Sequence, residues 1–242
     1  MAFRFRLIPF LATAVLVAIG VCAGRWQDGR AAHKLAQAAR LEAGNAAAPL
    51  AVGAAPLDAA EVELRRVQLR GEWVAGWPVY LANRPHAGQA GFYLLMPLRL
   101  AGSDMHVLVA RGWLARDKAD PNRLPSYGTP PGEVLVEGVA RLAPGKVRQL
   151  GEAARLAPGA IVQNADAAAV AAATGWRFQP FIVEQHAPDG PRADTLDVLV
   201  REWPAPAQGA DKHKGYAFQW YALAAMAVLF FVFTGLRKSG KH

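Results

Sequence analysis

The stretch that most constrains this chain lies near its C-terminal end, where residues 216–236 contain no charged side chain. A helix rises 1.5 Å per residue, so about twenty apolar residues are enough to cross the ~30 Å hydrocarbon layer of a membrane. The sequence therefore predicts a transmembrane helix over residues 213–236. His213, Tyr216 and Trp220 stand at its start with i, i+3, i+7 spacing, which predicts that they share one stripe of the helix.

A second apolar run near the N-terminus predicts another span over residues 7–24. Two alternatives stay open for this run. Val21-Cys22-Ala23 resembles a signal-peptide cleavage site, but the run continues into Trp26, an aromatic residue typical of membrane interfaces. A lipid anchor on Cys22 is disfavoured by Val21, where a small residue is usual. We therefore expect a retained anchor, followed by a helical extension.

The two predicted spans divide the chain and set its topology. Two spans place both termini on one side of the membrane, and Arg4 and Arg6 ahead of the first span favour the cytoplasmic side. Because the first span begins within a few residues of Met1, we expect a bacterial inner membrane. The expected segments are cytoplasmic tails 1–6 and 237–242, spans 7–24 and 213–236, a helical extension 25–42, a linker 43–60 and a periplasmic β-rich domain 61–212.

The middle of the chain has the pattern of short strands. Apolar and β-branched runs are separated by turn-forming residues such as Pro130-Pro131-Gly132. The fold class we expect is α+β, with two transmembrane helices bracketing a mostly antiparallel sheet or partly closed barrel. One short helix interrupts it over 165–174, with Asn164 as N-cap and Gly175 as C-cap. The predicted strands are 67–73, 79–84, 91–100, 105–114, 133–142, 178–185 and 196–202.

Composition argues against several classes of function. The net charge of +8 suits nucleic acid, but the basic residues are scattered and several flank apolar runs, so we expect lipid headgroups as their partners and no nucleic acid. A single cysteine excludes an intrachain disulfide. We find no phosphate-binding loop, nucleophile motif or metal-protease motif, and the other histidines have no spacing typical of a metal site. We therefore expect a protein that is not an enzyme.

Four stretches, in order, carry a resemblance to one family. They are Gly24-Arg25-Trp26-Gln27 with Arg30 and Lys34, Asn83-Arg84 with Gly88 and Gly91-Phe92, Val107 to Trp113, and His213-x-x-Tyr216-Ala217-x-Gln219-Trp220. The chain resembles the Surfeit locus protein 1 family of membrane-tethered assembly factors for haem-copper terminal oxidases. Ala110 stands where the family usually has Asn, and Asp211 and Lys214 depart from the family's usual surroundings of the histidine.

The resemblance implies a function in respiratory-chain biogenesis. It implies that the protein holds or delivers haem a during assembly of cytochrome c oxidase, with the oxidase catalytic subunit and haem-synthesis or other assembly proteins as partners. It also implies that His213 is a candidate ligand of the haem iron. The alternative is a membrane-tethered scaffold that stabilises an oxidase intermediate without binding haem.

The remaining candidate residues follow from residue chemistry. A neutral imidazole can ligate haem iron, and Arg25 and Arg30 can pair with haem propionates. Tyr216 and Trp220 suit either the cofactor or an ordinary aromatic belt. For partner binding we select Trp26, Gln27, Asn83, Arg84, Arg111 and Gln219, since an amide inside a span needs a partner and we expect the arginines at strand ends. Such arginines also commonly solvate a sheet edge.

Overall fold

The computed structural model describes residues 2–3, 5–117, 119–120, 123–145, 147, 154–187, 197–205 and 208–237. The chain forms two compact units. One combines residues 1–40 with 204–242 and contains most of one long helix and all of another. The other comprises residues 41–203 and contains a mixed β-sheet with short helices.

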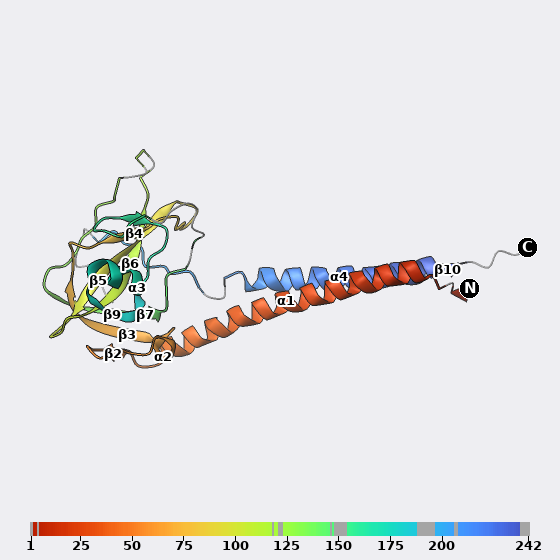
Figure 1. The fold of residues 1–242 in the computed structure, drawn as a ribbon, viewed down its shortest axis with the longest axis horizontal. Helices are drawn as coiled ribbons and strands as arrows, with labels where there is room; N and C mark the ends of the chain where they lie inside the picture. The colour runs from red at the N-terminus through yellow and green to blue at the C-terminus, as the bar shows by residue number, and fades with distance from the viewer. Residues whose placement is uncertain are drawn as a thin grey trace, which may run out of the picture. The chain divides into compact units, whose positions relative to one another are not determined.

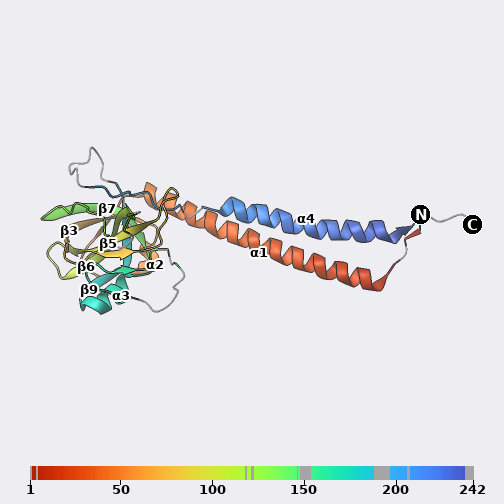
Figure 2. The ribbon, with the colours of Figure 1, turned by 90° about the horizontal axis from the view of Figure 1, so that it is seen from above.

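The first unit consists of two helices that run side by side (Figures 1 and 2). Helix α1 spans Leu7–Ala46 and α4 spans Ala210–Gly235. Short strands β1 (Ala2–Phe3) and β10 (Leu236–Arg237) pair antiparallel beyond the helix ends. By length and composition, both helices can cross a membrane. Two such apolar helices suggest a membrane-anchored protein.

The surface of this helix pair is apolar. Phe230, on α4, is 72% exposed, and Ile8, on α1, is 81% exposed. In water such a surface would be unfavourable, because burying a large apolar side chain is worth about 1.5–3 kcal/mol. The exposed side chains therefore fit a lipid environment.

Small residues recur where the two helices meet. The buried residues on α1 are Gly20, Gly24 and Ala31, and Ala217 and Ala224 are buried on α4. A Cβ atom added at Gly20 would lie 2.9 Å from the Cβ atom of Ala224, so a larger residue would force the helices apart. The spacings are four and seven residues on α1 and seven residues on α4, a heptad-like pattern typical of helices that pack at a shallow angle. We call this line of contacts the helix seam.

The second unit is built around a ring of five strands. Its elements are β2 (Leu50–Val52), α2 (Ala59–Val62), β3 (Arg66–Trp73), β4 (Val79–Leu81), β5 (Gly91–Leu100), β6 (Met105–Ala115), β7 (Glu133–Arg141), β8 (Ile161–Val162), α3 (Ala167–Thr174) and β9 (Arg177–Gln185). The pairings β3–β7–β9–β6–β5 return to β3 and close the ring. The expected partly closed barrel is therefore a closed one, but its sheet is mixed: β2–β3, β4–β8 and β6–β9 pair in parallel.

Large apolar side chains fill the barrel. Val67 and Leu69 of β3, Leu98 of β5, Val107 of β6 and Phe181 of β9 have no exposed surface and pack in one cluster. The alternate residues of each strand point to the same face, which is why these side chains meet inside. All members of this core belong to the barrel unit.

Several sequence-based boundaries were wrong. The stretch 43–60, expected to be a linker, contains the end of α1, strand β2 and the start of α2. The short helix has Asp166 rather than Asn164 as its N-cap, because the Asp166 carboxylate accepts a hydrogen bond from the Ala169 N–H at 2.9 Å. Asn164 instead bonds both backbone groups of Val147. Gly175 closes the helix in a left-handed conformation, as predicted.

Two predicted strands also differ. Strand β4 ends at Leu81, and Asn83 adopts a positive φ of 58°, so the chain turns before Arg84. Within the described residues 197–202 there is no strand, but Val200 forms an isolated bridge to Trp113 of β6. Leu196, the predicted first residue of that strand, lies outside the described residues.

Candidate functional site in the helix pair

The helix seam contains a polar pair among its small residues. His213 lies in the first turn of α4, and its Nδ1 atom is 2.6 Å from the Oε1 atom of Gln27 on α1. Both side chains are half-buried. Gln27 follows Gly20 and Gly24 at the same 4–3 spacing, which explains why the amide points across the seam. The sequence separates these two residues by 186 positions.

This contact fixes the chemistry of the imidazole. A glutamine Oε1 only accepts hydrogen bonds, so Nδ1 of His213 is the donor. In a neutral imidazole the other nitrogen, Nε2, then carries a lone pair. A histidine that ligates a metal typically donates its second ring N–H to an oxygen acceptor of this kind. The pair therefore presents an oriented nitrogen ligand.

Two further contacts tie the helices together near this pair. The Tyr221 hydroxyl donates to a carboxylate oxygen of Asp28 at 2.8 Å, and the Lys34 ammonium donates to the Gln208 carbonyl at 2.9 Å. The Tyr221 ring occupies the space that a side chain at position 24 would need, so Gly24 is required for this arrangement. Together these contacts hold the start of α4 in register with α1.

The predicted stripe of His213, Tyr216 and Trp220 is only partly a shared face. His213 and Trp220 are half-buried toward the seam, with Ala217 buried between them, whereas Tyr216 is exposed. On α4 the helix seam therefore passes through His213, Ala217 and Trp220, and Tyr216 lies outside it. Tyr216 has the exposure of an interfacial aromatic residue.

The other predicted residues of the helix pair are exposed. Arg25, Trp26 and Arg30 on α1 and Gln219 on α4 present their side chains away from the seam. Among the described residues, Gln219 has no hydrogen-bond partner on α1, so α1 does not supply the partner that an amide inside a span needs. Arg25 and Arg30 are accessible to anionic groups.

Of the three candidate residues of the barrel unit, Arg84 and Arg111 are buried, whereas Asn83 is exposed. Arg111 was expected at a strand end, but it lies within β6 and is only 2% exposed. It is the extra residue of a β-bulge, since Leu94 pairs with Gly112 and Leu95 pairs with Ala110. Its guanidinium donates to the Thr129 hydroxyl at 2.7 Å and to the Gly128 carbonyl at 3.0 Å.

Asn83 and Arg84 follow strand β4. The positive φ of Asn83 turns the chain, and the Arg84 carbonyl accepts a 2.6 Å hydrogen bond from the indole N–H of Trp113. Arg84 is 6% exposed. These family-motif residues therefore hold the loop after β4 against β6, a structural task that the sequence reading did not identify.

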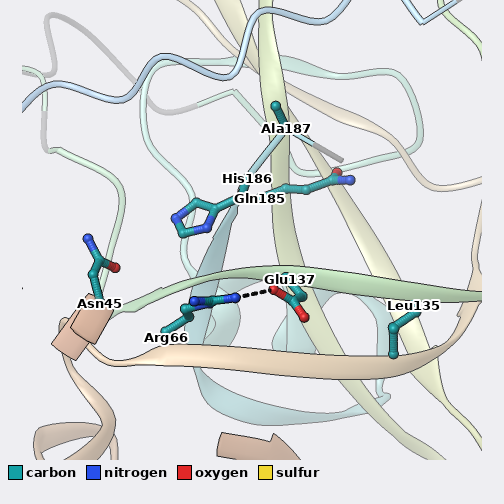
Figure 3. A pocket seen from close by; sticks show the side chains of 7 residues that line it. All are labelled: Asn45, Arg66, Leu135, Glu137, Gln185, His186 and Ala187. Carbon is teal, nitrogen blue, oxygen red and sulfur yellow. Dashed lines mark hydrogen bonds and ion pairs between the residues drawn. The ribbon is translucent and has the colours of Figure 1, made fainter. Parts of the chain in front are cut away.

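A polar groove of about 430 Å³ lies on the barrel unit, lined by Asn45, Arg66, Leu135, Glu137, Gln185, His186 and Ala187 (Figure 3). Its charged groups are already paired. Arg66 and Gln68 each donate to Glu137 at 2.9 Å, and these hydrogen bonds hold the pKa of the Glu137 carboxyl below its ordinary value. None of the predicted site residues lines this groove. Because Arg66 and Glu137 already pair with each other, we do not select the groove as a cofactor site.

No group of three or more metal-binding side chains occurs among the described residues.

Comparison with known proteins agrees with the motifs. The profile of the SURF1 family matches residues 14–225. The chain belongs to this family. It is 26% identical over 216 residues to Surfeit locus protein 1 of Rattus norvegicus, a match that covers 84% of this chain and 67% of the rat protein. It is 27% identical over 233 residues to the Homo sapiens protein of that name, covering 87% and 73% of the two chains.

A SURF1-like protein of Monosiga brevicollis is 26% identical over 233 residues, covering 90% of this chain and 83% of the relative. The family is known in general for oxidase assembly factors rather than for catalysts. The region of this chain that matches the family profile, residues 14–225, includes the helix-seam contacts between residues 20 and 224.

The sequence analysis selected Gln27 and His213 separately. Their pairing could have been found from the repeat of small residues that places Gln27 on the seam.

Proposed function

We propose that this protein is an assembly factor for a haem-copper terminal oxidase of the cytochrome c oxidase type, and that it holds haem a for delivery to the catalytic subunit. The observation that carries the proposal is the contact between Gln27 and His213. In the neutral imidazole this contact leaves the lone pair of Nε2 free to ligate a metal, at the start of an apolar helix. A single protein ligand suits a carrier, because a cargo held weakly can be released.

The residues around His213 fit the chemical parts of a haem. When bound, haem a would supply an iron that the neutral imidazole of His213 could ligate. Lys212 and Lys214 flank His213 and are exposed, as are Arg25 and Arg30, so these cations can pair with propionates. Tyr216 and Trp220 provide aromatic surface next to the apolar part of the helix.

The proposed site lies at the edge of a membrane. We infer that residues 7–24 and 213–236 span a bacterial inner membrane, with both termini cytoplasmic and the barrel unit periplasmic. His213 then marks the point where the second span meets water. The macrocycle and isoprenoid tail of haem a favour hydrocarbon and its propionates favour water, so this boundary suits the whole cofactor.

Haem occupancy tests the proposal. The full chain is produced in cells that make haem a and purified in detergent, and its Soret absorbance per protein is measured. We expect the wild type to carry the chromophore and His213→Ala to lose most of it. His33→Ala is the matched control, because His33 is an exposed histidine on α1. Equal haem content in wild type and His213→Ala would overturn the role of His213.

A scaffold without haem is the second candidate, and exposed Gln219 favours it. An amide on an otherwise apolar, lipid-facing stripe is costly unless a partner helix supplies a hydrogen bond. If the protein acts only as a scaffold, Gln219→Leu will lose oxidase subunits from a pull-down, and no preparation will contain haem. If it carries haem, Gln219→Leu will keep the chromophore whatever happens to the subunits.

A further inference from the structure

Arg84 is the buried cation of the barrel unit that is paired least well. Its residue is 6% exposed, and the Nη2 atom donates to the Gln163 carbonyl at 3.1 Å. Its guanidinium lies 5.7 Å from the centre of the Tyr93 ring. The Nε–H is buried without an acceptor, and no described carboxylate forms an ion pair with this side chain. Burial lowers the pKa of Arg84 from its ordinary value, but a guanidinium stays charged at neutral pH.

Burying a charge without an oppositely charged partner lowers the stability of the fold, so the presence of Arg84 at this position needs a physical explanation. Other arginines of the unit show the usual solution. Arg201 is buried but has Asp197 at 2.9 Å, and Arg141 has Glu184 at 3.5 Å. Arg84 differs from both because a carbonyl and an aromatic ring face it, and neither carries a formal negative charge. The charge is therefore available to an anion from outside the unit.

A pocket of about 300 Å³ gives such an anion access to Arg84. Most of its wall is apolar and is formed by Ala143, Pro144, Val147, Ala165 and Ala169. The other polar side chains of the wall already make hydrogen bonds within the unit. Asn164 uses its amide oxygen and nitrogen on Val147, and Asp166 accepts from the Ala169 N–H as the cap of α3.

These features define the ligand's chemistry. Among the described residues, Arg84 is the one cationic side chain on the wall, which suits a single negative charge, and bidentate binding to a carboxylate is the geometry that arginine favours. The Asp166 carboxylate on the wall would repel a doubly charged phosphate more strongly than a singly charged carboxylate. The small apolar side chains would pack against a short hydrocarbon body. We propose that this pocket binds a monocarboxylate carried on a short apolar chain, with Arg84 as the group that recognises the carboxylate.

Binding of butyrate to the full-length protein in lipid nanodiscs tests the proposal. Saturation-transfer NMR at pH 7 should show saturable binding of butyrate in the millimolar range, as expected for a ligand of about six heavy atoms, and no competition from n-butanol or inorganic phosphate. Arg84→Met should weaken butyrate binding at least tenfold. Arg99→Met changes the net charge equally but at an exposed arginine outside the pocket, and it should bind as the wild type does.

A second variant tests the pocket without changing Arg84. Ala169→Leu fills the pocket from α3 with a residue that favours helices, and leaves Arg84 in place. It should also weaken butyrate binding at least tenfold. Absence of saturable binding in the wild type, or unchanged binding in either variant, would overturn the proposal.

The stability of the ligand-free protein separates recognition from scaffolding. If Arg84 serves a ligand, Arg84→Met should unfold at the same or a higher denaturant concentration than the wild type, since an unpaired buried charge is removed. Arg141→Met, which leaves Glu184 without its partner, should unfold at a lower one. A large loss of stability in Arg84→Met would show that Arg84 is structural and would contradict the proposal.

The carboxylate can come from a free small acid or from an acidic side chain of a polypeptide. Titration with acetyl-Ala-Glu-Ala-amide beside butyrate distinguishes them. Tighter binding of the peptide assigns the pocket to a protein side chain, and tighter or equal binding of butyrate assigns it to a small acid. Both results retain the recognition of a carboxylate by Arg84.

Discussion

The helix pair and the barrel bury their contacts in opposite ways. The barrel core consists of large side chains such as Phe181 and Leu69, which are wholly inaccessible, and its surface is polar. The helix seam consists of glycines and alanines, and the large side chains of the helices face outward. The barrel keeps its large apolar side chains inside, whereas the apolar outer surface of the helix pair suggests a membrane anchor. A polar pair inside the small-residue seam, Gln27 with His213, is therefore conspicuous and points to function.

The same substitution in both regions gives the largest contrast. Phe181→Ala would leave a cavity in the barrel core and should lower the free energy of unfolding by about 3–5 kcal/mol. Phe230→Ala, at a position 72% exposed on α4, should change it by less than about 1 kcal/mol in lipid, where the side chain contacts hydrocarbon before and after. Denaturant unfolding followed by tryptophan fluorescence measures both. Equal losses would contradict the assignment of the two environments.

Enlarging a seam residue should separate the helices. Gly20→Leu places atoms where Ala224 and the Trp220 carbonyl already lie, and overpacking of this kind costs about 1–3 kcal/mol. Ala18→Leu, at an exposed position of the same helix, is the control and should be neutral. Cross-linking between cysteines introduced on the two helices would report the separation. Unchanged cross-linking in Gly20→Leu would refute the seam.

Removing the acceptor of His213 should weaken the site without removing the ligand. Gln27→Leu leaves the Nδ1–H of His213 without its oxygen, so the imidazole loses its fixed orientation. Changes of this type in metal sites typically cost 10–100-fold in affinity. We expect lower haem content than in the wild type but more than in His213→Ala, and partial recovery in Gln27→Glu. Full haem content in Gln27→Leu would exclude a positioning role.

The smallest effect should come from a histidine of the barrel. Burial is the main cause that lowers the pKa of His106 below its ordinary 6.5, and its ring stacks on Trp176. The unfolded chain therefore binds this proton more readily, so the barrel loses stability as the pH falls below about 6.5. His106→Gln should make unfolding less dependent on pH between 7 and 5. An unchanged pH dependence would remove His106 from the account.

Sequence reasoning succeeded where a repeating pattern decides the structure. The charge-free run after Tyr216 predicted α4, and the bounds of β5 were predicted without error because Gly91 and Ala101-Gly102 end the apolar run. Sequence reasoning failed where contacts between residues distant in the sequence determine the structure. Val200 pairs with Trp113 only as an isolated bridge, and Arg111 is buried because a bulge turns it inward. No local pattern encodes either outcome.

The candidate site was likewise predicted only in part. The family motifs predicted His213 and Gln27 as separate functional residues, because each has unusual chemistry for its position. Their hydrogen bond depends on the register of two helices far apart in sequence, which the small residues set. The pocket beside Arg84 could not be predicted from the sequence either. It is formed where the loop after β4, the loop after β7 and the start of α3 meet.

Ligation of iron by His213 is best measured on the iron itself. The protein is purified with haem a from cells grown on ¹⁵N-histidine, and electron–nuclear double resonance of the ferric form detects histidine nitrogen bound to the metal. We predict a ¹⁵N-histidine coupling in the wild type that disappears in His213→Ala and persists in His33→Ala. A wild-type haem without histidine coupling, or a coupling that survives in His213→Ala, would contradict the account.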